Sequence, residues 1–235
     1  GKPVILAGPC VIESPDHALK MAEMLSKLVN DRGFHYVFKA SYDKANRSSI
    51  NSFRGPGLHE GLKVLQHIKS SLNIPVVTDI HSVDQISHAA EVADIIQIPA
   101  FLCRQTDLYL EAGKYDVIVN VKKGQFMSPG NMKNVIDKAR ECGIKRLMIT
   151  ERGTSFGYER LVVDYAGLAS MQRYGVPLIF DGTHSVQLPG AGGSVTLGMR
   201  EYVPHLCRAA VAVGIQGLFL EVHDCPDEAL CDGPN

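Results

Sequence analysis

Short apolar runs alternate along the chain with longer stretches of helical periodicity. Eight runs are almost continuously hydrophobic or β-branched: PVILAGP (3–9), YVFKASY (36–42), PVVTDIH (75–81), DIIQIPA (94–100), VIVNVKK (117–123), RLMITER (146–152), PLIFDGT (177–183) and GLFLEVH (217–223). Strands of this kind are buried on both faces, as in a parallel sheet covered by helices. The runs therefore predict eight parallel strands.

The segments between these runs have the pattern of amphipathic helices. After the first run, Ser14 is a plausible N-cap and Pro15 suits the first helical position. One apolar stripe then follows at helical spacing: Ala18, Met21, Ala22, Leu25, Leu28 and Val29. Eight strand–helix repeats predict a single (β/α)8 TIM barrel over residues 1–235. A doubly wound sheet is the alternative, but no glycine-rich dinucleotide fingerprint follows any run.

Two segments depart from this simple repeat. Only HDCPDEALCDGPN completes the sequence from the end of the eighth run, which is too short for a loop and a closing helix. We therefore expect that the closing C-terminal helix is absent from this chain or that the native chain continues. The glycine-rich stretch QLPGAGGSVTLGMRE (187–201) predicts a loop after the seventh strand.

Composition limits the kinds of partner that the protein is expected to bind. The formal net charge of −1 provides no basic field for nucleic acid or an anionic membrane surface. The longest apolar stretch, AAVAVGIQGLFLEV, is broken by Gln216 and is too short to span a bilayer. The start of the sequence has no signal-like region. We expect a cytoplasmic protein that binds small molecules, with no nucleic-acid or membrane partner.

Polar or reactive groups stand at the ends of all eight predicted strands: Cys10, Lys39 and Ser41, Asp79 and His81, Gln97, Lys122, Arg152, His184, Glu221 and His223. Residues two apart in a strand share a face, so several of these groups should point the same way. In a barrel, the carboxyl ends of the strands form the active-site face. Stability does not explain such a ring, because burying charge without partners is expensive. The ring predicts an active site.

Basic side chains are concentrated at this end although the whole chain is nearly neutral: Lys39, Lys44, Arg47, Lys122 and Arg152. This excess indicates a ligand with several negative groups, such as phosphates and a carboxylate. Lys123 has the opposite parity, and we expect it to be a solvated surface charge.

The thiol of Cys10 requires its own interpretation. No CxxC pair occurs among the six cysteines, and Cys103, Cys142 and Cys207 suit buried packing positions. Cys10, His184, Glu221 and Asp232 are donors that suit a divalent transition metal, namely Zn²⁺, Fe²⁺ or Mn²⁺, with His223 as a rival ligand. The spacing leaves this metal site and a Cys–His nucleophile equally open. The other histidines are expected at surface or packing positions.

FKASYDKANRSSINSFRGPG is the most specific segment of the chain. Together with GPCVIES, TDIH, IIQIPAFLCRQTDL, NVKKGQF, ITERGTSFGY, DGTHSVQLPG and GMREY, it resembles the 3-deoxy-D-manno-octulosonate 8-phosphate synthase family along essentially the whole chain. The resemblance implies a (β/α)8 barrel, usually a homotetramer. It also implies condensation of phosphoenolpyruvate with D-arabinose 5-phosphate and water, in lipopolysaccharide sugar biosynthesis.

The same resemblance implies roles for individual residues. Phosphoenolpyruvate would bind Lys44, Gln97, Lys122 and Arg152. The pentose phosphate would bind Asn46, Arg47 and Ser48, with Arg104 from a neighbouring subunit. Lys39 and Asp79 would lie beside the reacting carbons. Metal-dependent members have cysteine in the GPC motif, so Cys10, His184, Glu221 and Asp232 would be the metal ligands.

Three other functions remain to be weighed. The related synthase that uses erythrose 4-phosphate has a KPRTS-type motif where this chain has KANRSS. A Schiff-base aldolase would use one barrel lysine as its nucleophile. A non-catalytic phosphosugar-binding barrel would retain the cationic groups but need neither metal ligands nor Lys39.

Overall fold

Eight parallel strands form a closed barrel. The structure is a computed structural model that describes residues 2–47, 49–192 and 195–231. The barrel strands follow one another in space in the order β1-β12-β9-β6-β5-β4-β3-β2, and each of the eight predicted runs contributes one of them. Their bounds are β1 (Val4–Gly8), β2 (His35–Lys39), β3 (Val76–Asp79), β4 (Ile95–Ile98), β5 (Ile118–Lys122), β6 (Leu147–Glu151), β9 (Leu178–Asp181) and β12 (Gly217–Glu221).

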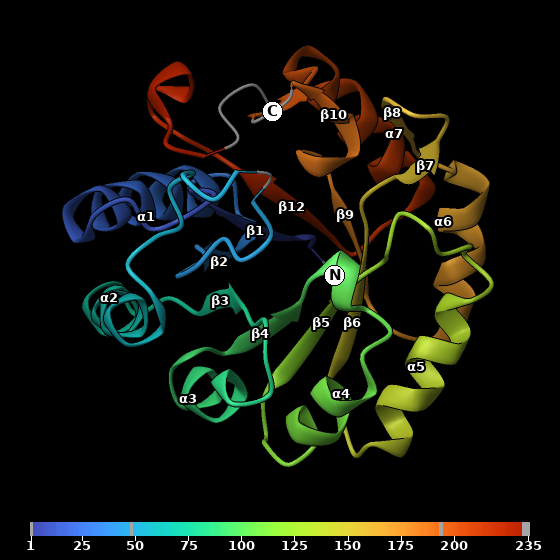
Figure 1. Cartoon of the computed structure of the whole chain (residues 1–235), viewed down its shortest axis with the longest axis horizontal. Helices are drawn as coiled ribbons and strands as arrows, with labels where there is room; N and C mark the ends of the chain where they lie inside the picture. The colour runs from blue at the N-terminus through green and yellow to red at the C-terminus, as the bar shows by residue number, and fades with distance from the viewer. Residues whose placement is uncertain (1, 48, 193–194, 232–235) are drawn as a thin grey trace.

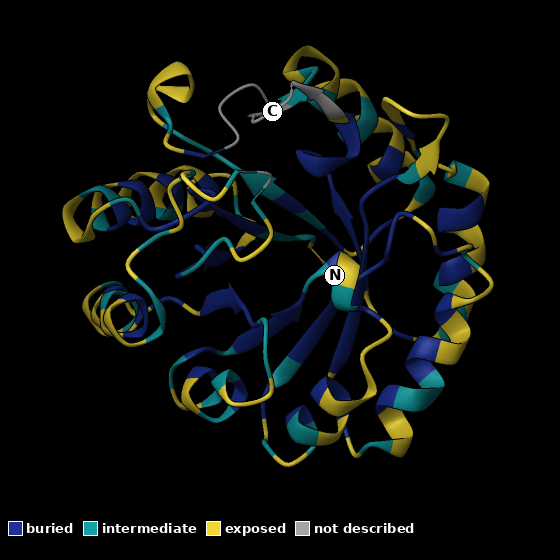
Figure 2. Cartoon of the chain, viewed as in Figure 1, coloured by how far each residue is buried: buried dark blue, intermediate teal, exposed yellow. Residues whose placement is uncertain are grey.

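Helices surround the strands (Figure 1) and turn their buried faces inward (Figure 2). They are α1 (Pro15–Asn30), α2 (Leu58–Leu72), α3 (Gln85–Val92), α4 (Thr106–Ala112), α5 (Met132–Glu141), α6 (Tyr165–Met171) and α7 (Val203–Val213). In α1, Ser14 is extended and its hydroxyl accepts the His17 N–H at 3.2 Å, which confirms the predicted N-cap. The predicted apolar stripe is buried except for Leu28, which is 45% exposed because it lies at the edge of the stripe.

Alternation along the strands determines what fills the barrel. The apolar residues that pack together inside it are Leu6, Val37, Val77, Ile95, Met148, Ile179 and Phe219. The second residue beyond several of them, toward the carboxyl end, is polar: Lys39, Asp79, Gln97, Thr150, Asp181 and Glu221. The predicted parity is therefore confirmed for Lys39, Asp79 and Glu221, and the polar groups lie above an apolar plug.

Two antiparallel hairpins extend the carboxyl end of the barrel. β7 (Thr154–Phe156) pairs with β8 (Arg160–Val162) after β6, and β10 (Gln187–Gly192) pairs with β11 (Val195–Gly198) after β9. The prediction of a loop over 187–201 is thus wrong for the paired part. Main-chain hydrogen bonds hold a hairpin without large side chains, and a register shift between Leu188 and Gly192 accommodates the glycine-rich stretch.

Short 3-10 turns complete the description. They are η1 (Ala100–Leu102), η2 (Gln172–Tyr174), η3 (His184–Val186), η4 (Arg200–Tyr202) and η5 (Pro226–Glu228). From β12 to Cys231, η5 is the only helical turn in the described chain. No helix among the described residues is long and apolar enough to cross a membrane.

Candidate active site

A cavity of about 240 Å³ opens at the carboxyl ends of the strands. Ten predicted site residues line it: Lys39, Lys44, Asn46, Arg47, Asp79, Gln97, Lys122, Arg152, His184 and Glu221. Six further residues that were not predicted from the sequence also line it: Pro99, Ala100, Phe101, Gln125, Gln187 and Pro189. These residues lie in loops after strands β4, β5 and β9 and in the β10 hairpin. There, the alternation of side chains along a barrel strand no longer indicates which way each side chain points.

The other predicted residues are placed differently. Cys10 is buried beside the cavity without lining it. Arg104 is exposed after η1 and is not among the lining residues, and its backbone carbonyl accepts from Lys138 Nζ at 2.8 Å. Ser48 and Asp232 lie outside the described residues.

Glu221 anchors two lysines at the cavity floor. Its Oε1 lies 2.6 Å from Lys39 Nζ and 3.5 Å from Lys44 Nζ, and Lys39 also donates to the Cys10 carbonyl at 2.8 Å. Burial raises the pKa of Glu221, but the charges of Lys39 and Lys44 outweigh it and hold this pKa well below its usual range. Glu221 is therefore an anion that orients the Lys39 ammonium.

Asp181, which was not predicted from the sequence, organises the opposite side of the cavity. Its Oδ2 lies 2.5 Å from Lys122 Nζ and 2.7 Å from His184 Nδ1, while its Oδ1 accepts the His184 N–H at 2.9 Å. Burial lowers the pKa of Lys122 although Asp181 opposes this, and burial also lowers the pKa of His184. Because Ile179 faces the barrel interior, strand alternation alone could have revealed that Asp181 does so too.

Asp79 is a third buried anion at this site. Ser41 Oγ donates to its Oδ1, and His81 Nε2 lies 2.9 Å from its Oδ2. Burial raises the pKa of Asp79, but the hydrogen bond and charge of His81 and the charge of Lys39 outweigh it and lower this pKa below its usual range. The site thus contains fixed negative groups between its cations.

Hydrogen bonds to uncharged side chains hold Gln97 and Arg152. Asn120 Nδ2 donates to Gln97 Oε1 at 3.0 Å, and Thr150 Oγ1 donates to Asn120 Oδ1 at 2.7 Å. Arg152 Nη2 donates to Gln187 Oε1 at 2.6 Å, which connects the guanidinium to the β10 hairpin. These contacts pre-position planar groups for a bound anion.

The comparison with known proteins decides the family. Residues 1–235, the whole chain, match the DAHP synthetase I family. The chain belongs to this family. It is similar to 2-dehydro-3-deoxyphosphooctonate aldolases from Geobacter sulfurreducens, at 58% identity over 232 residues (99% of this chain, 85% of the relative), and from Synechococcus sp., at 56% over 231 residues (98% and 81%).

In this DAHP synthetase I family member, the predicted metal ligands suit a divalent transition metal. His184 Nε2 lies 3.5 Å from Glu221 Oε2, and that oxygen is buried without a hydrogen-bond partner among the described residues. Asp181 holds the other ring nitrogen of His184, as carboxylates do beside metal-binding histidines. The unsatisfied oxygen of Glu221 and the orientation of His184 are compatible with metal binding by these two side chains.

Cys10 is the other predicted metal ligand that the structure describes, but among the described residues it does not form a group with His184 and Glu221 in which all three ligand atoms lie within 4.8 Å of one another. Its thiol donates to Cys231 Sγ at 2.8 Å, and Arg47 Nη1 donates to the same sulfur at 2.7 Å. Burial raises the pKa of Cys10 well above its usual range, and the hydrogen bond with Cys231 and the charge of Glu221 raise it further. A thiolate at this position therefore needs an added cation. Cys231 therefore contacts both Cys10, a predicted metal ligand, and Arg47, a residue predicted to bind the sugar phosphate.

Two residues differ from their predicted environments. His223 was placed on the same face as Glu221, but β12 ends at Glu221, and His223 does not line the cavity. Lys123 points away from the barrel interior as its parity predicts, yet it is 1% exposed rather than solvated. Its ammonium donates to Met127 O at 3.1 Å and to Thr154 Oγ1 at 3.0 Å, because the β7 hairpin and the turn after β5 cover it.

Proposed function

We propose that this protein condenses phosphoenolpyruvate with D-arabinose 5-phosphate and water, giving 3-deoxy-D-manno-octulosonate 8-phosphate and inorganic phosphate. The observation that carries this proposal is one cavity lined by Lys44, Lys122 and Arg152 together with Asn46 and Arg47. Such a cavity suits two phosphorylated substrates bound side by side. The whole-chain similarity to 2-dehydro-3-deoxyphosphooctonate aldolases supports the same reaction.

Phosphoenolpyruvate is assigned to the groups deep in the barrel. Lys44, Lys122 and Arg152 neutralise its phosphate and carboxylate, and Gln97 adds a hydrogen bond. Glu221 and Asp181 keep the lysine ammonium groups in place before the substrate arrives. Fixing the substrate in this way converts a bimolecular encounter into an oriented one, which can contribute several kcal/mol, about 7–11 in favourable cases.

The pentose phosphate is assigned to Asn46, Arg47 and Ser48 at the mouth of the cavity. Arg104 would join them from a neighbouring subunit of a homotetramer, since it does not line the cavity of its own chain. The KANRSS sequence at 44–49 suits the longer pentose better than erythrose 4-phosphate. This assignment makes the segment after β2 the specificity element.

Cys10, His184, Glu221 and Asp232 would hold a divalent metal, Fe²⁺, Zn²⁺ or Mn²⁺. When bound, the metal would polarise the sugar aldehyde or orient the attacking water. The softness of a thiolate and an imidazole favours a transition metal over Mg²⁺ or Ca²⁺.

The reaction then uses the fixed charges of the chain. C3 of phosphoenolpyruvate bonds to the aldehyde carbon, and the Lys39 ammonium donates a proton to the new alkoxide. Positive character develops at C2, where water adds and releases a proton that restores the Lys39 ammonium through solvent. Asp79 lies beside this carbon as a fixed anion. The hemiketal phosphate finally breaks its C–O bond and releases inorganic phosphate, whose charge Lys122 and Arg152 stabilise.

The decisive assay measures phosphate release from phosphoenolpyruvate with arabinose 5-phosphate or erythrose 4-phosphate, before and after EDTA and Mn²⁺ addition. Turnover with the pentose alone, lost to EDTA and restored by Mn²⁺, supports substrate and metal together. Turnover of the pentose that persists in protein shown to be metal-free would support the proposed reaction and contradict the proposed role of the metal. Turnover with erythrose 4-phosphate alone would replace the proposed substrate.

A Schiff-base aldolase is favoured by one observation, the lowered pKa of the buried Lys122 amine. Borohydride reduction in the presence of substrate should leave no covalent adduct if our proposal is correct. A non-catalytic sugar-phosphate-binding protein would give no phosphate release at all.

The cellular context belongs to the same proposal. All six cysteines are free, as is usual in a reducing compartment. We therefore place the enzyme in the cytoplasm, where it would supply the sugar of lipopolysaccharide.

A further inference from the structure

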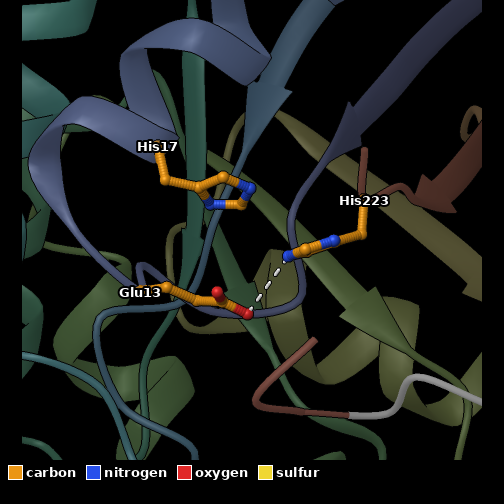
Figure 3. Close-up of side chains that lie close together, drawn as sticks. All are labelled: Glu13, His17 and His223. Carbon is orange, nitrogen blue, oxygen red and sulfur yellow. Dashed lines mark ion pairs between the residues drawn. The ribbon is translucent and has the colours of Figure 1, made fainter. Parts of the chain in front are cut away.

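A cluster outside the cavity contains Glu13, His17 and His223 (Figure 3). Glu13 follows β1, His17 lies in the first turn of α1, and His223 follows β12. One ligand atom from each residue lies within 4.8 Å of the other two. The side chains are only 13–16% exposed, and none of them lines the active-site cavity. They face a separate hollow that Asp224 and Glu228 also line.

The hydrogen bonds in this cluster leave two imidazole nitrogens unsatisfied. His17 Nδ1 and His223 Nε2 are both buried and have no hydrogen-bond partner among the described residues. His223 Nε2 lies 3.4 Å from Glu13 Oε1 without forming a hydrogen bond. A buried polar atom without a partner costs about 1–3 kcal/mol. Two such atoms beside one carboxylate therefore indicate a partner that the described residues do not supply.

Asp224 orients the first of these rings. Its Oδ1 lies 3.0 Å from His17 Nε2, and its Oδ2 accepts from Lys20 Nζ at 2.6 Å. A proton on His17 Nε2 directed at this carboxylate leaves a lone pair on Nδ1. Histidines that bind metals usually make this second contact to a carboxylate.

The His223 ring can also present a free lone pair, on Nε2, if its proton moves to Nδ1. The Cys225 N–H donates to His223 Nδ1 at 3.0 Å, which places the ring proton on Nε2. Moving that proton to Nδ1 would direct it at Asp224 Oδ1, 3.4 Å away, and would free the Nε2 lone pair. The Cys225 amide would then turn to solvent, to which this residue is exposed.

We propose that Glu13, His17 and His223 bind a divalent transition metal of the Zn²⁺ and Co²⁺ class. Two neutral imidazoles and one carboxylate are a common set of three protein ligands for zinc, with water in the fourth position. Hard cations such as Ca²⁺ prefer oxygen ligands and six to eight of them. The donor set thus selects against the alkaline-earth metals.

This site would fasten the segment after β12 to the start of α1. Glu13 Oε1 also accepts the Leu230 N–H at 2.9 Å, and Leu230 immediately precedes Cys231. An ion held by Glu13 and His223 would therefore fix the chain that brings Cys231 against Cys10. Its role would be structural, because no ligand touches the active-site cavity.

Cobalt titration of chelator-treated protein tests the proposal. Wild type, His17→Gln and the control His67→Gln, an exposed histidine of α2, are compared by equilibrium dialysis and absorption spectroscopy. We expect His17→Gln to bind one equivalent of Co²⁺ fewer than the other two proteins. The lost equivalent should show no thiolate-to-cobalt charge transfer, and the rise in Tm on adding Co²⁺ should shrink.

Equal Co²⁺ binding by His17→Gln and His67→Gln would overturn the proposal. Loss of an equivalent that carries the thiolate band would also overturn it, because that ion belongs to Cys10. Glu13→Gln provides a second variant if His17→Gln does not fold, with the same expected loss. Since no measurement uses turnover, failure here leaves the proposed reaction untouched.

Discussion

Replacing Lys123 with methionine should destabilise the protein by about 3–5 kcal/mol, as expected when one partner of a buried ion pair is removed. The Lys123 ammonium lies 3.5 Å from Glu151 Oε1, and both side chains are 1% exposed. Glu151 Oε1 also accepts the N–H groups of Arg152 at 3.0 Å and Gly153 at 2.6 Å. The substitution therefore leaves a carboxylate buried directly beneath Arg152.

The magnitude follows from the contacts that are lost. Lys123 donates to Thr154 Oγ1, to Met127 O and, at 3.3 Å, to Gly124 O. Hydrogen bonds from a charged group contribute about 1.5–3 kcal/mol each, and methionine of similar length regains part of the loss by apolar burial. The double variant Lys123→Met/Glu151→Gln should recover part of the stability, because no unpaired charge remains.

The loss should depend on pH. Burial raises the pKa of Glu151, and Lys123 opposes this rise, so removing Lys123 raises the pKa of Glu151 further. A carboxyl group whose pKa is higher in the folded state binds more protons there. Stability therefore falls as pH rises from the pKa of the unfolded state, about 4.3, toward the pKa of the folded state. The deficit of Lys123→Met should be larger at pH 8 than at pH 5.

Urea unfolding at both pH values measures these free energies. Lys133→Met is the matched control, because the Lys133–Asp137 pair is exposed and should contribute only about 0.3–0.5 kcal/mol. A deficit for Lys123→Met below about 1 kcal/mol at pH 8 would refute the reasoning. So would a deficit that is equal at both pH values.

Two further substitutions test the active site, and a third tests the packing of the barrel. Cys10→Asn should remove the metal equivalent that has a thiolate ligand, measured by metal analysis and cobalt absorption, and retention of that equivalent would show the ligand assignment to be wrong. Arg47→Ala should raise the KM for arabinose 5-phosphate about tenfold or more, as expected for loss of a charged hydrogen bond. The KM for phosphoenolpyruvate should rise far less. Equal effects on both KM values, or the same effect in the exposed control Arg54→Ala, would contradict the pocket assignment. Gly8→Ala should cost about 1–3 kcal/mol in urea unfolding, because its Cβ would lie 2.0 Å from Lys39 O, and wild-type stability would contradict that close approach.

The barrel and most of its polar rim could be predicted because buried parallel strands leave a strong sequence pattern. Near-continuous hydrophobicity marks each strand, and alternation then indicates which residues share the interior with Val37, Val77 and Phe219. Lys39 and Glu221 were found in this way, and the structure places them 2.6 Å apart.

The errors occur where alternation ends or where tertiary contacts decide burial. His223 lies beyond the last residue of β12, so its direction follows the loop and not the strand. Lys123 faces outward, but only the three-dimensional structure reveals that a short hairpin covers it. The β10–β11 pairing is set by main-chain hydrogen bonds, which a glycine-rich sequence does not reveal.

Barrel closure has a consequence for how the enzyme is made. β1 closes the barrel against β12, with Gly8 paired to Glu221 across most of the sequence. During synthesis, Lys39 and Cys10 leave the ribosome long before Glu221, so the cavity floor cannot assemble on a partial chain. Contacts this distant in sequence are also slow to form. Nascent chains should therefore acquire turnover only after the last barrel strand has been synthesised and has docked.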